Sequence, residues 1–132
     1  MSEEERLMMN VPHNRTFVAL GAGMLWFGWF GFNGGSALGS KSGQAVYAVV
    51  NSSIAAAAAM CTWTSVEWYH LGKPSIVGGC VGLVAGLATV TPTAGFIRPW
   101  AAFLLGSVCG PFCYGCVELR KVPSPSPAII PF

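Results

Sequence analysis

The stretch WFGWFGFNGGSA, residues 26–37, contains four side chains that a helix would place on one face. At spacings of i, i+3, i+4 and i+7 these are Trp29, Phe32, Asn33 and Ser36. The shared face offers aromatic rings, an amide and a hydroxyl, and it carries no formal charge. Ring faces attract a small cation through cation–π contact, and a hydroxyl can accept one of its hydrogen bonds. The spacing therefore suits a site for a small cation.

The same face has two other interpretations. Trp and Phe side chains also form aromatic belts, which anchor a helix at the headgroup level of a membrane, and composition alone favours this belt. The ring of Phe32 also suits an apolar constriction, which gates by excluding water. The residues themselves leave these alternatives open.

Other polar residues of the apolar segments have simpler expected roles. We expect Asn51, Ser52 and Ser53 to make hydrogen bonds between helices. Glu67 lies at the end of the same segment, and we expect it to be solvated at the membrane interface.

His13 and His70 lie in polar flanks, so we assign neither a role in transport. Cys109, Cys113 and Cys116 share a helical face, but they are one ligand short of a zinc site, and we interpret them as packing residues. The sequence contains no Ser-His-Asp arrangement, phosphate-binding loop or paired carboxylates. We therefore expect no enzyme, no cofactor and no metal.

The composition indicates that lipid surrounds these elements. The chain has 132 residues, of which 53% are hydrophobic and 9% charged, whereas a soluble domain has about a quarter charged residues. The net charge of +2, with no basic run, gives no sign of a nucleic-acid partner. Four segments are long and apolar enough for membrane helices, namely about 16–33, 45–68, 75–90 and 99–117. The predicted fold class is an all-α polytopic membrane protein with four transmembrane helices.

The basic residues predict the orientation. Five lie on one side of this topology, namely Arg6, Arg15, Lys73, Arg120 and Lys121. The other two, Lys41 and Arg98, lie on the opposite side. Cytoplasmic loops carry the excess of Lys and Arg, so both termini are predicted to be cytoplasmic. Residues 1–15 form a cytoplasmic segment, residues 16–117 the membrane domain, and residues 118–132 a disordered Pro/Ser-rich tail.

Two helices carry small residues at four-residue spacing. The glycines are Gly78, Gly82 and Gly86 on the third segment, and Gly106 and Gly110 on the fourth. Such stripes let helix backbones approach each other closely within a membrane. They predict close packing and say nothing about a substrate.

Three strings in order resemble the ammonium transporter, methylammonium permease and Rhesus protein family. They are LWFGWFGFNGGSALGS, AVVNSSIAAAAA and EWYHLGKPSIVGGCVGLVAGLATVTPTAGFIRPWAAFLLG. Over residues 11–117 they are similar to the sixth to ninth membrane helices of that family, and NVPHN resembles its fungal members. The resemblance implies part of an eleven-helix, homotrimeric channel with two inverted halves.

The resemblance implies a role for each residue of the aromatic face. Phe32 resembles one of two stacked gate phenylalanines, Trp29 a tryptophan that lines the pore, and Ser36 the hydroxyl of the external site that recruits ammonium. In this family ammonium is recruited at that site, loses its proton and crosses as ammonia. The resemblance therefore favours the cation-binding interpretation over the aromatic belt.

The same resemblance implies that much of the pore lies outside this sequence. The paired pore histidines, the second gate phenylalanine and the tryptophan of the recruitment site belong to helices that it does not match. After ELRKV the chain departs from the family pattern and reads PSPSPAIIPF, as a truncated chain would.

We therefore expect a plasma-membrane protein of the ammonium or methylammonium transport family that does not conduct alone. The alternative is a non-conducting protein that docks through its glycine faces to full-length ammonium transporters and modulates them.

Overall fold

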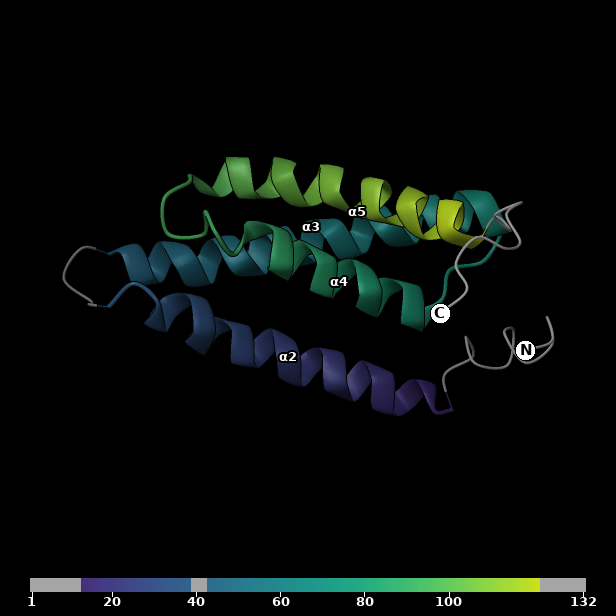
Figure 1. The fold of residues 1–132 in the computed structure, drawn as a ribbon, viewed down its shortest axis with the longest axis horizontal. Coiled ribbons are helices and arrows are strands. Elements are labelled where there is room, and N and C mark those ends of the chain that lie inside the picture. The colour runs from purple at the N-terminus through teal and green to yellow at the C-terminus, as the bar shows by residue number, and fades with distance from the viewer. Residues whose placement is uncertain (1–12, 39–42, 122–132) are drawn as a thin grey trace, which may run out of the picture.

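The computed structural model describes residues 13–38 and 43–121 as a bundle of helices. The four helices in these ranges are α2 (Arg15–Gly35), α3 (Gln44–Leu71), α4 (Ile76–Val90) and α5 (Pro99–Lys121). Successive helices run in opposite directions along the long axis (Figure 1). The connections after α2 and α4 therefore share one end of the bundle, and the connection after α3 lies at the other. Within the described ranges no strand occurs, which confirms the all-α class.

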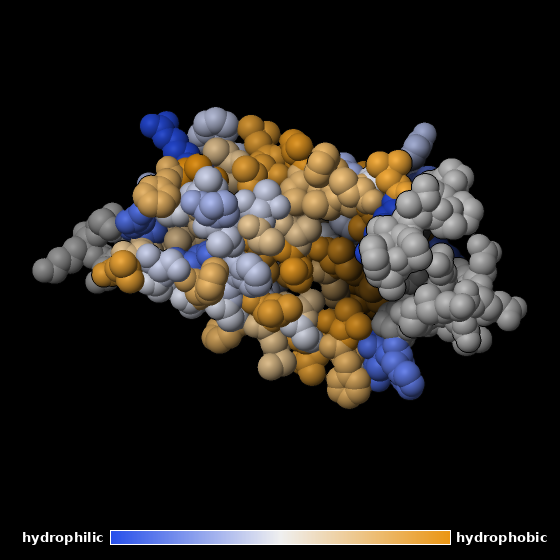
Figure 2. Space-filling view, in the orientation of Figure 1, coloured by the Kyte–Doolittle hydropathy of each residue, from blue (hydrophilic) through white to orange (hydrophobic). Residues whose placement is uncertain are grey.

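Two of the helices are long and apolar enough to cross a membrane. They are α3, with 28 residues, and the part of α5 from Pro99 to Arg120, with 22 residues. The apolar helix α4 is shorter, with 15 residues. Apolar side chains cover the middle of the face in Figure 2, and the most hydrophilic residues lie toward its ends. This distribution agrees with a helical membrane protein.

The helix ends follow from local capping. The Oδ1 atom of Asn14 accepts hydrogen bonds from the backbone N–H groups of Thr16 (2.9 Å) and Phe17 (3.4 Å), which starts α2. Gly72 ends α3 with a φ of 75°, in the left-handed region that favours glycine. Ser75 caps the start of α4 by accepting from the N–H of Gly78.

The observed helices differ in length from the predicted segments. Helices α2, α3 and α5 continue past the predicted ends, to Gly35, Leu71 and Lys121. Residues 118–121, which we assigned to the tail, are thus the last turn of α5. The remainder of the predicted tail and residues 1–12 lie outside the described residues.

Helix α3 is the centre of the packing, because it contacts α2, α4 and α5. Glycines from two helices meet its alanine tract. A Cβ atom added at Gly86 of α4 would lie 2.6 Å from the carbonyl oxygen of Ala55, and one at Gly110 of α5 would lie 2.7 Å from that of Ala59. A Cβ at Gly106 would likewise meet the backbone of Ala55. The glycines therefore permit direct backbone contact on two sides of α3.

The predicted close packing at the glycine stripes is confirmed, and it corrects one expectation. Gly78, Gly82 and Gly86 all face α3, as do Gly106 and Gly110. Because these faces are occupied within the chain, they are not available to dock another transporter. The prediction of docking through the glycine faces is wrong.

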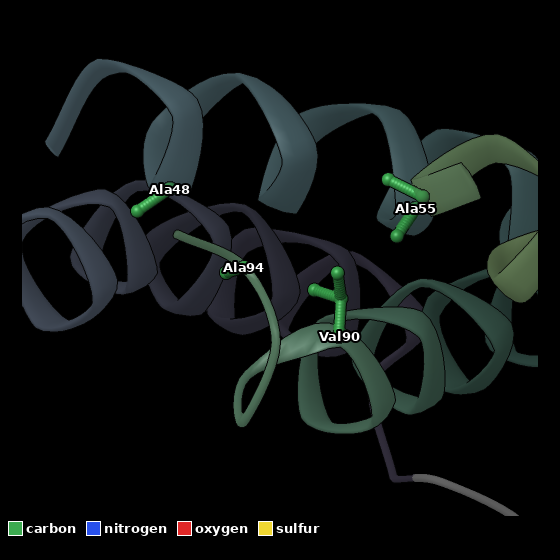
Figure 3. Packing of buried hydrophobic residues seen from close by; sticks show 5 residues of the cluster. Ala48, Ala55, Val90 and Ala94 are labelled. Carbon is green, nitrogen blue, oxygen red and sulfur yellow. The ribbon is translucent and has the colours of Figure 1, made fainter. Parts of the chain in front are cut away.

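A small apolar core extends from these contacts toward the connection after α4. Ala48 and Ala55 of α3 meet Val90 and Ala94, as Figure 3 shows, and each of these side chains is at most 2% exposed. Ala102 of α5 completes the cluster. The core therefore joins the end of α4 to the first half of α3.

We expect Gly106→Ala to lower the free energy of unfolding by about 1–3 kcal/mol, because its methyl group would collide with backbone rather than with a movable side chain. The matched control is Gly115→Ala on the same helix, where nothing lies within 4 Å of the added atom. This control should be neutral or more stable by about 1 kcal/mol, since alanine favours helices. Unfolding in mixed micelles, followed by circular dichroism, measures both. Equal effects of the two variants would contradict the packing described.

Candidate functional site

A pocket of about 240 Å³ lies at the end of the bundle where α2 ends and α3 begins. Part of the connection between α4 and α5 closes another side of it. The pocket is lined by Phe32, Asn33, Ser36, Ala37, Gln44, Ala48, Thr91, Ala94, Gly95 and Phe96. None of these residues carries a formal charge. The pocket thus offers aromatic rings and neutral polar groups.

The predicted helical face is part of this pocket. Phe32, Asn33 and Ser36 line it directly, and the Phe32 side chain is 60% exposed. Trp29 lies one turn earlier on α2, and its ring centroid is 5.8 Å from that of Phe32 with the planes at 60°. Three residues of the predicted face thus line the pocket, and Trp29 contacts one of them, Phe32, from outside the lining.

Two hydroxyl groups of the pocket already donate their hydrogen bonds to the backbone. Ser36 Oγ donates to the backbone oxygen of Phe32 (2.6 Å), and Thr91 Oγ1 donates to that of Leu87 (2.7 Å). Trp29 Nε1 donates in turn to Thr91 Oγ1, at 2.8 Å. A hydroxyl has one proton and two lone pairs, so both groups can act toward a ligand only as acceptors in this arrangement.

A buried hydrogen bond holds α2 against α3 behind the pocket. Asn33 Nδ2 donates to Ser52 Oγ at 2.7 Å, and Ser52 Oγ donates to the backbone oxygen of Ala48 at 2.6 Å. The interhelical role predicted for Ser52 is thus confirmed. For Ser53 it is wrong, because this hydroxyl donates to the carbonyl of Val49 in its own helix.

Asn51 positions the connection that closes the pocket. This residue is fully buried, and its Nδ2 donates to the backbone oxygens of Ala94 and Ile97, both at 2.7 Å. Both acceptors lie in the connection between α4 and α5. The bond predicted for Asn51 therefore reaches a connection instead of another helix.

Glu67 is a correction to the sequence analysis. It is 7% exposed and not solvated. Its two carboxyl oxygens accept from the backbone N–H (3.1 Å) and the hydroxyl (3.0 Å) of Ser75. The carboxyl group of Glu67 fits here because Gly78 has no side chain, and a Cβ atom at Gly78 would collide with it. The carboxyl group thus joins the end of α3 to the start of α4, at the opposite end from the pocket.

The histidines also lie away from the pocket. His13 is exposed before α2, and His70 Nδ1 lies 2.8 Å from the hydroxyl of Tyr114 near the end of α3. Among the cysteines, Cys109 and Cys113 have their sulfur atoms 3.7 Å apart. The described residues include no group of three or more potential metal ligands.

Thr91 is one of the lining residues that the sequence analysis missed. It stands at the end of α4, and its hydroxyl bonds a side chain 62 residues earlier. No spacing within a helix links two such distant positions. Only the string ATVTPTAGF, which contributes to the family resemblance, drew attention to this segment.

The fold and this pocket define a helical membrane protein with a neutral site rich in aromatic rings and acceptors. The model of the Ammonium Transporter Family matches residues 2–123, and the chain belongs to this family. The chain is 46% identical over 111 residues to an ammonium transporter of Aquifex aeolicus, and 41% identical over 112 residues to the ammonium transporter MEP2 of Saccharomyces cerevisiae. The crystal structure of the latter species' Mep2 superposes with a TM-score of 0.80 at 41% identity.

These matches cover most of this chain and a minor part of each relative. They include 84% of the chain in all three comparisons, but 26% of the Aquifex transporter, 22% of MEP2 and 25% of the Mep2 crystal structure. Mep2 of Candida albicans gives the same picture, with a TM-score of 0.80 over 85% of this chain and 25% of that one. The chain thus spans about a quarter of the length of these relatives.

We expect Asn51→Leu to destabilise the connection after α4, because it removes the donors to the buried carbonyl of Ala94 and the partly buried carbonyl of Ile97. The cost of such groups is about 1–3 kcal/mol each. The measurement is amide hydrogen exchange, which should accelerate at Phe96 and Ile97, whose N–H groups bond within this connection. As a control, Ser53→Ala removes only a bond within α3 and should leave exchange at those two amides unchanged. Equal protection in the Asn51 variant would rule out the anchoring role.

Proposed function

We propose that this chain forms one wall of an ammonium recruitment site and its aromatic gate in a membrane permease. Trp29, Phe32 and Ser36 are the residues that carry this role. The observation that carries the proposal is the hydrogen bonding of the hydroxyls: those of Ser36 and Thr91 donate to backbone carbonyls, so toward a ligand they can only accept. Ammonium has donors on every side and no acceptor, so it complements such a lining.

The aromatic rings supply the second part of the interaction. The exposed ring of Phe32 lies against Trp29, and ring faces attract a cation by about 0.5–2 kcal/mol. None of the described residues that line the pocket is charged, so they would hold a bound cation without an ion pair. Transport requires that a site be favourable enough to fill and weak enough to empty. Methylammonium presents the same kind of donors and fits the same chemistry.

We place this site at the external side of the plasma membrane, with the helices spanning it. The alternating helix directions put Arg15, Lys73 and Arg120 at one end of the bundle, and Arg98 with the pocket at the other. The excess of basic residues marks the cytoplasmic end, and both termini belong there. Lys41, the other basic residue used for the orientation, lies outside the described residues.

Lipid is the partner that fits the outer surface. A larger groove of about 630 Å³ beside α5 is bordered by apolar side chains that include Trp100, Leu104 and Val108, each more than half exposed. Such a surface suits acyl chains or a neighbouring subunit. Homotrimers, which the family resemblance implies, would cover part of it.

A chimera tests the recruitment site. Residues 15–121 would replace the matching segment of Saccharomyces cerevisiae Mep2, to which the chain is similar in sequence and fold. In yeast without its own ammonium permeases, we expect Ser36→Ala to raise the half-saturating methylammonium concentration about tenfold or more, because a hydrogen bond to a charged group contributes about 1.5–3 kcal/mol. Phe32→Ala should impair uptake as well.

The matched control for this chimera is Phe27→Ala. Phe27 is 78% exposed on the same helix and does not line the pocket, so its loss should leave uptake within about twofold of the parent chimera. If the Ser36 and Phe32 variants transport as well as the Phe27 variant, the proposed site is wrong.

We expect no ammonium conduction by the 132 residues alone. The pocket has walls from α2, α3 and one connection, and the Phe32 ring remains 60% exposed beside it. Both histidines of the sequence lie at the other end of the bundle. The measurement is growth of the permease-deficient strain on low ammonium, with the membrane insertion of the chain verified by immunoblot. Robust growth from this chain alone would refute the expectation.

The alternative function is a non-conducting partner of full-length ammonium transporters. The docking surface first expected for this alternative is not available, because α3 packs on the glycine stripes of α4 and α5. A surface that stays exposed for it is α2, where Phe17, Met24 and Phe27 are each more than two thirds exposed. Co-purification with a full-length transporter, abolished by polar substitutions at these three positions, would favour this alternative.

A further inference from the structure

A chain of hydrogen bonds connects the aromatic pair of α2 to the end of α4. Trp29 Nε1 donates to Thr91 Oγ1 at 2.8 Å, and Thr91 Oγ1 donates to the backbone oxygen of Leu87 at 2.7 Å. Because the hydroxyl proton is committed to Leu87, the lone pair that faces the indole has a fixed direction. The bond can therefore orient the indole ring.

This bond is a specific feature of Trp29. The indole nitrogens of Trp26 and Trp63 are also buried, and within the described residues neither has a hydrogen-bond partner. Packing in this bundle thus accommodates an indole without an acceptor. The acceptor at Trp29 is not explained by burial alone.

The indole stands between Thr91 and the ring of the gate residue. One side of Trp29 packs on the cluster of Ala56, Leu83 and Leu87, and its ring centroid is 5.8 Å from that of Phe32. Apolar packing is non-directional, whereas a hydrogen bond weakens steeply when its angle changes. The cluster therefore determines where the indole lies, and the bond to Thr91 determines how it is turned.

We propose that Thr91 is a positioning residue, whose hydroxyl sets the orientation of the Trp29 indole and, through ring contact, that of Phe32 in the pocket. The functional meaning of this orientation rests on the proposed function, since Phe32 is there the gate. The connection after α4 would thus control the gate ring from a position outside α2. Asn51 holds the same connection through two backbone oxygens, so the reference point is rigid.

The test uses the full 132-residue chain in lipid nanodiscs, with tryptophan labelled by nitrogen-15. The sequence has five tryptophans, so five indole N–H signals are expected, and Trp29→Phe identifies one of them. In Thr91→Val, which keeps the shape and removes the hydroxyl, we expect the Trp29 signal to shift and its exchange with water to accelerate by about 2- to 12-fold, the equivalent of one hydrogen bond. The nuclear Overhauser contact between Trp29 and Phe32 should weaken. Thr91→Ser restores the hydroxyl and should restore all three.

Thr93→Val is the matched control, because Thr93 belongs to the same connection but its hydroxyl donates only to Val90 and does not line the pocket. It should leave the Trp29 signal unchanged. An unchanged signal in Thr91→Val, or an equal change in Thr91→Ser, would overturn the proposal. A measurement on the unaltered chain needs no variant to fold: the Trp29 indole must exchange more slowly than that of Trp68, which is 61% exposed, and equal rates would also overturn it.

Titration with ammonium chloride, against sodium chloride, separates this proposal from the proposed function. A shift of the Trp29 signal with ammonium alone supports both. If the signal ignores ammonium while Thr91→Val still changes it and Thr91→Ser restores it, the positioning role stands without ammonium binding by the 132 residues alone. The recruitment site itself is refuted only if the Ser36 and Phe32 variants of the Mep2 chimera also transport normally.

Discussion

The backbones of α4 and α5 approach α3 on two sides at the level of Ala55 and Ala59, where glycines leave no side chain between them. In a membrane the hydrophobic effect gives helices little reason to associate, so such contacts supply much of the packing energy. The same contacts determine the height at which α4 meets α3. A displaced α4 would move its last turn, which carries Val90 and Thr91, away from the pocket. The site therefore depends on a contact that involves none of its own residues.

Polar tethers then convert this packing into a pocket. Asn51 is fully buried, and its side-chain amide donates both hydrogen bonds to the connection after α4. Asn33 of α2 donates to Ser52 of α3. Each tether starts from the first half of α3 and fixes a different wall. These hydrogen bonds lie in apolar surroundings. Breaking one of them would therefore leave its donor or acceptor without a partner. A neutral pocket between mobile walls would lose its shape, so the precision of the site comes from α3.

Periodicity within one segment predicted the aromatic face and the glycine stripes, because all members of each set share a helix. It failed wherever the partner lies in another element. Asn51 and Ser53 belong to one helix and have similar polarity, yet the first bonds a connection 43 residues away and the second its own turn. Glu67 seemed solvated because it stands near a helix end, and the return of the chain at Ser75 buries it. The role of Thr91 could not be predicted for the same reason. A threonine after an apolar helix has no distinguishing pattern, and its partner Trp29 lies in α2.

The distribution of carboxyl groups explains why a neutral pocket suits the proposed function. An intramembrane carboxylate would attract ammonium strongly, but it would also hold the cation and charge the pocket after each release. The one buried carboxyl group among the described residues, Glu67, lies about 15 residues beyond Ser52 on α3, roughly 22 Å away along the helix, and its oxygens accept from Ser75. Hydroxyls whose single donor is already used in a hydrogen bond offer a milder alternative. Ser36 and Thr91 offer lone pairs without a net charge, so they favour a ligand with donors on every side, such as ammonium, over ammonia, which also carries a lone pair. Under the proposed function, such a pocket would favour ammonium over ammonia without holding it in an ion pair.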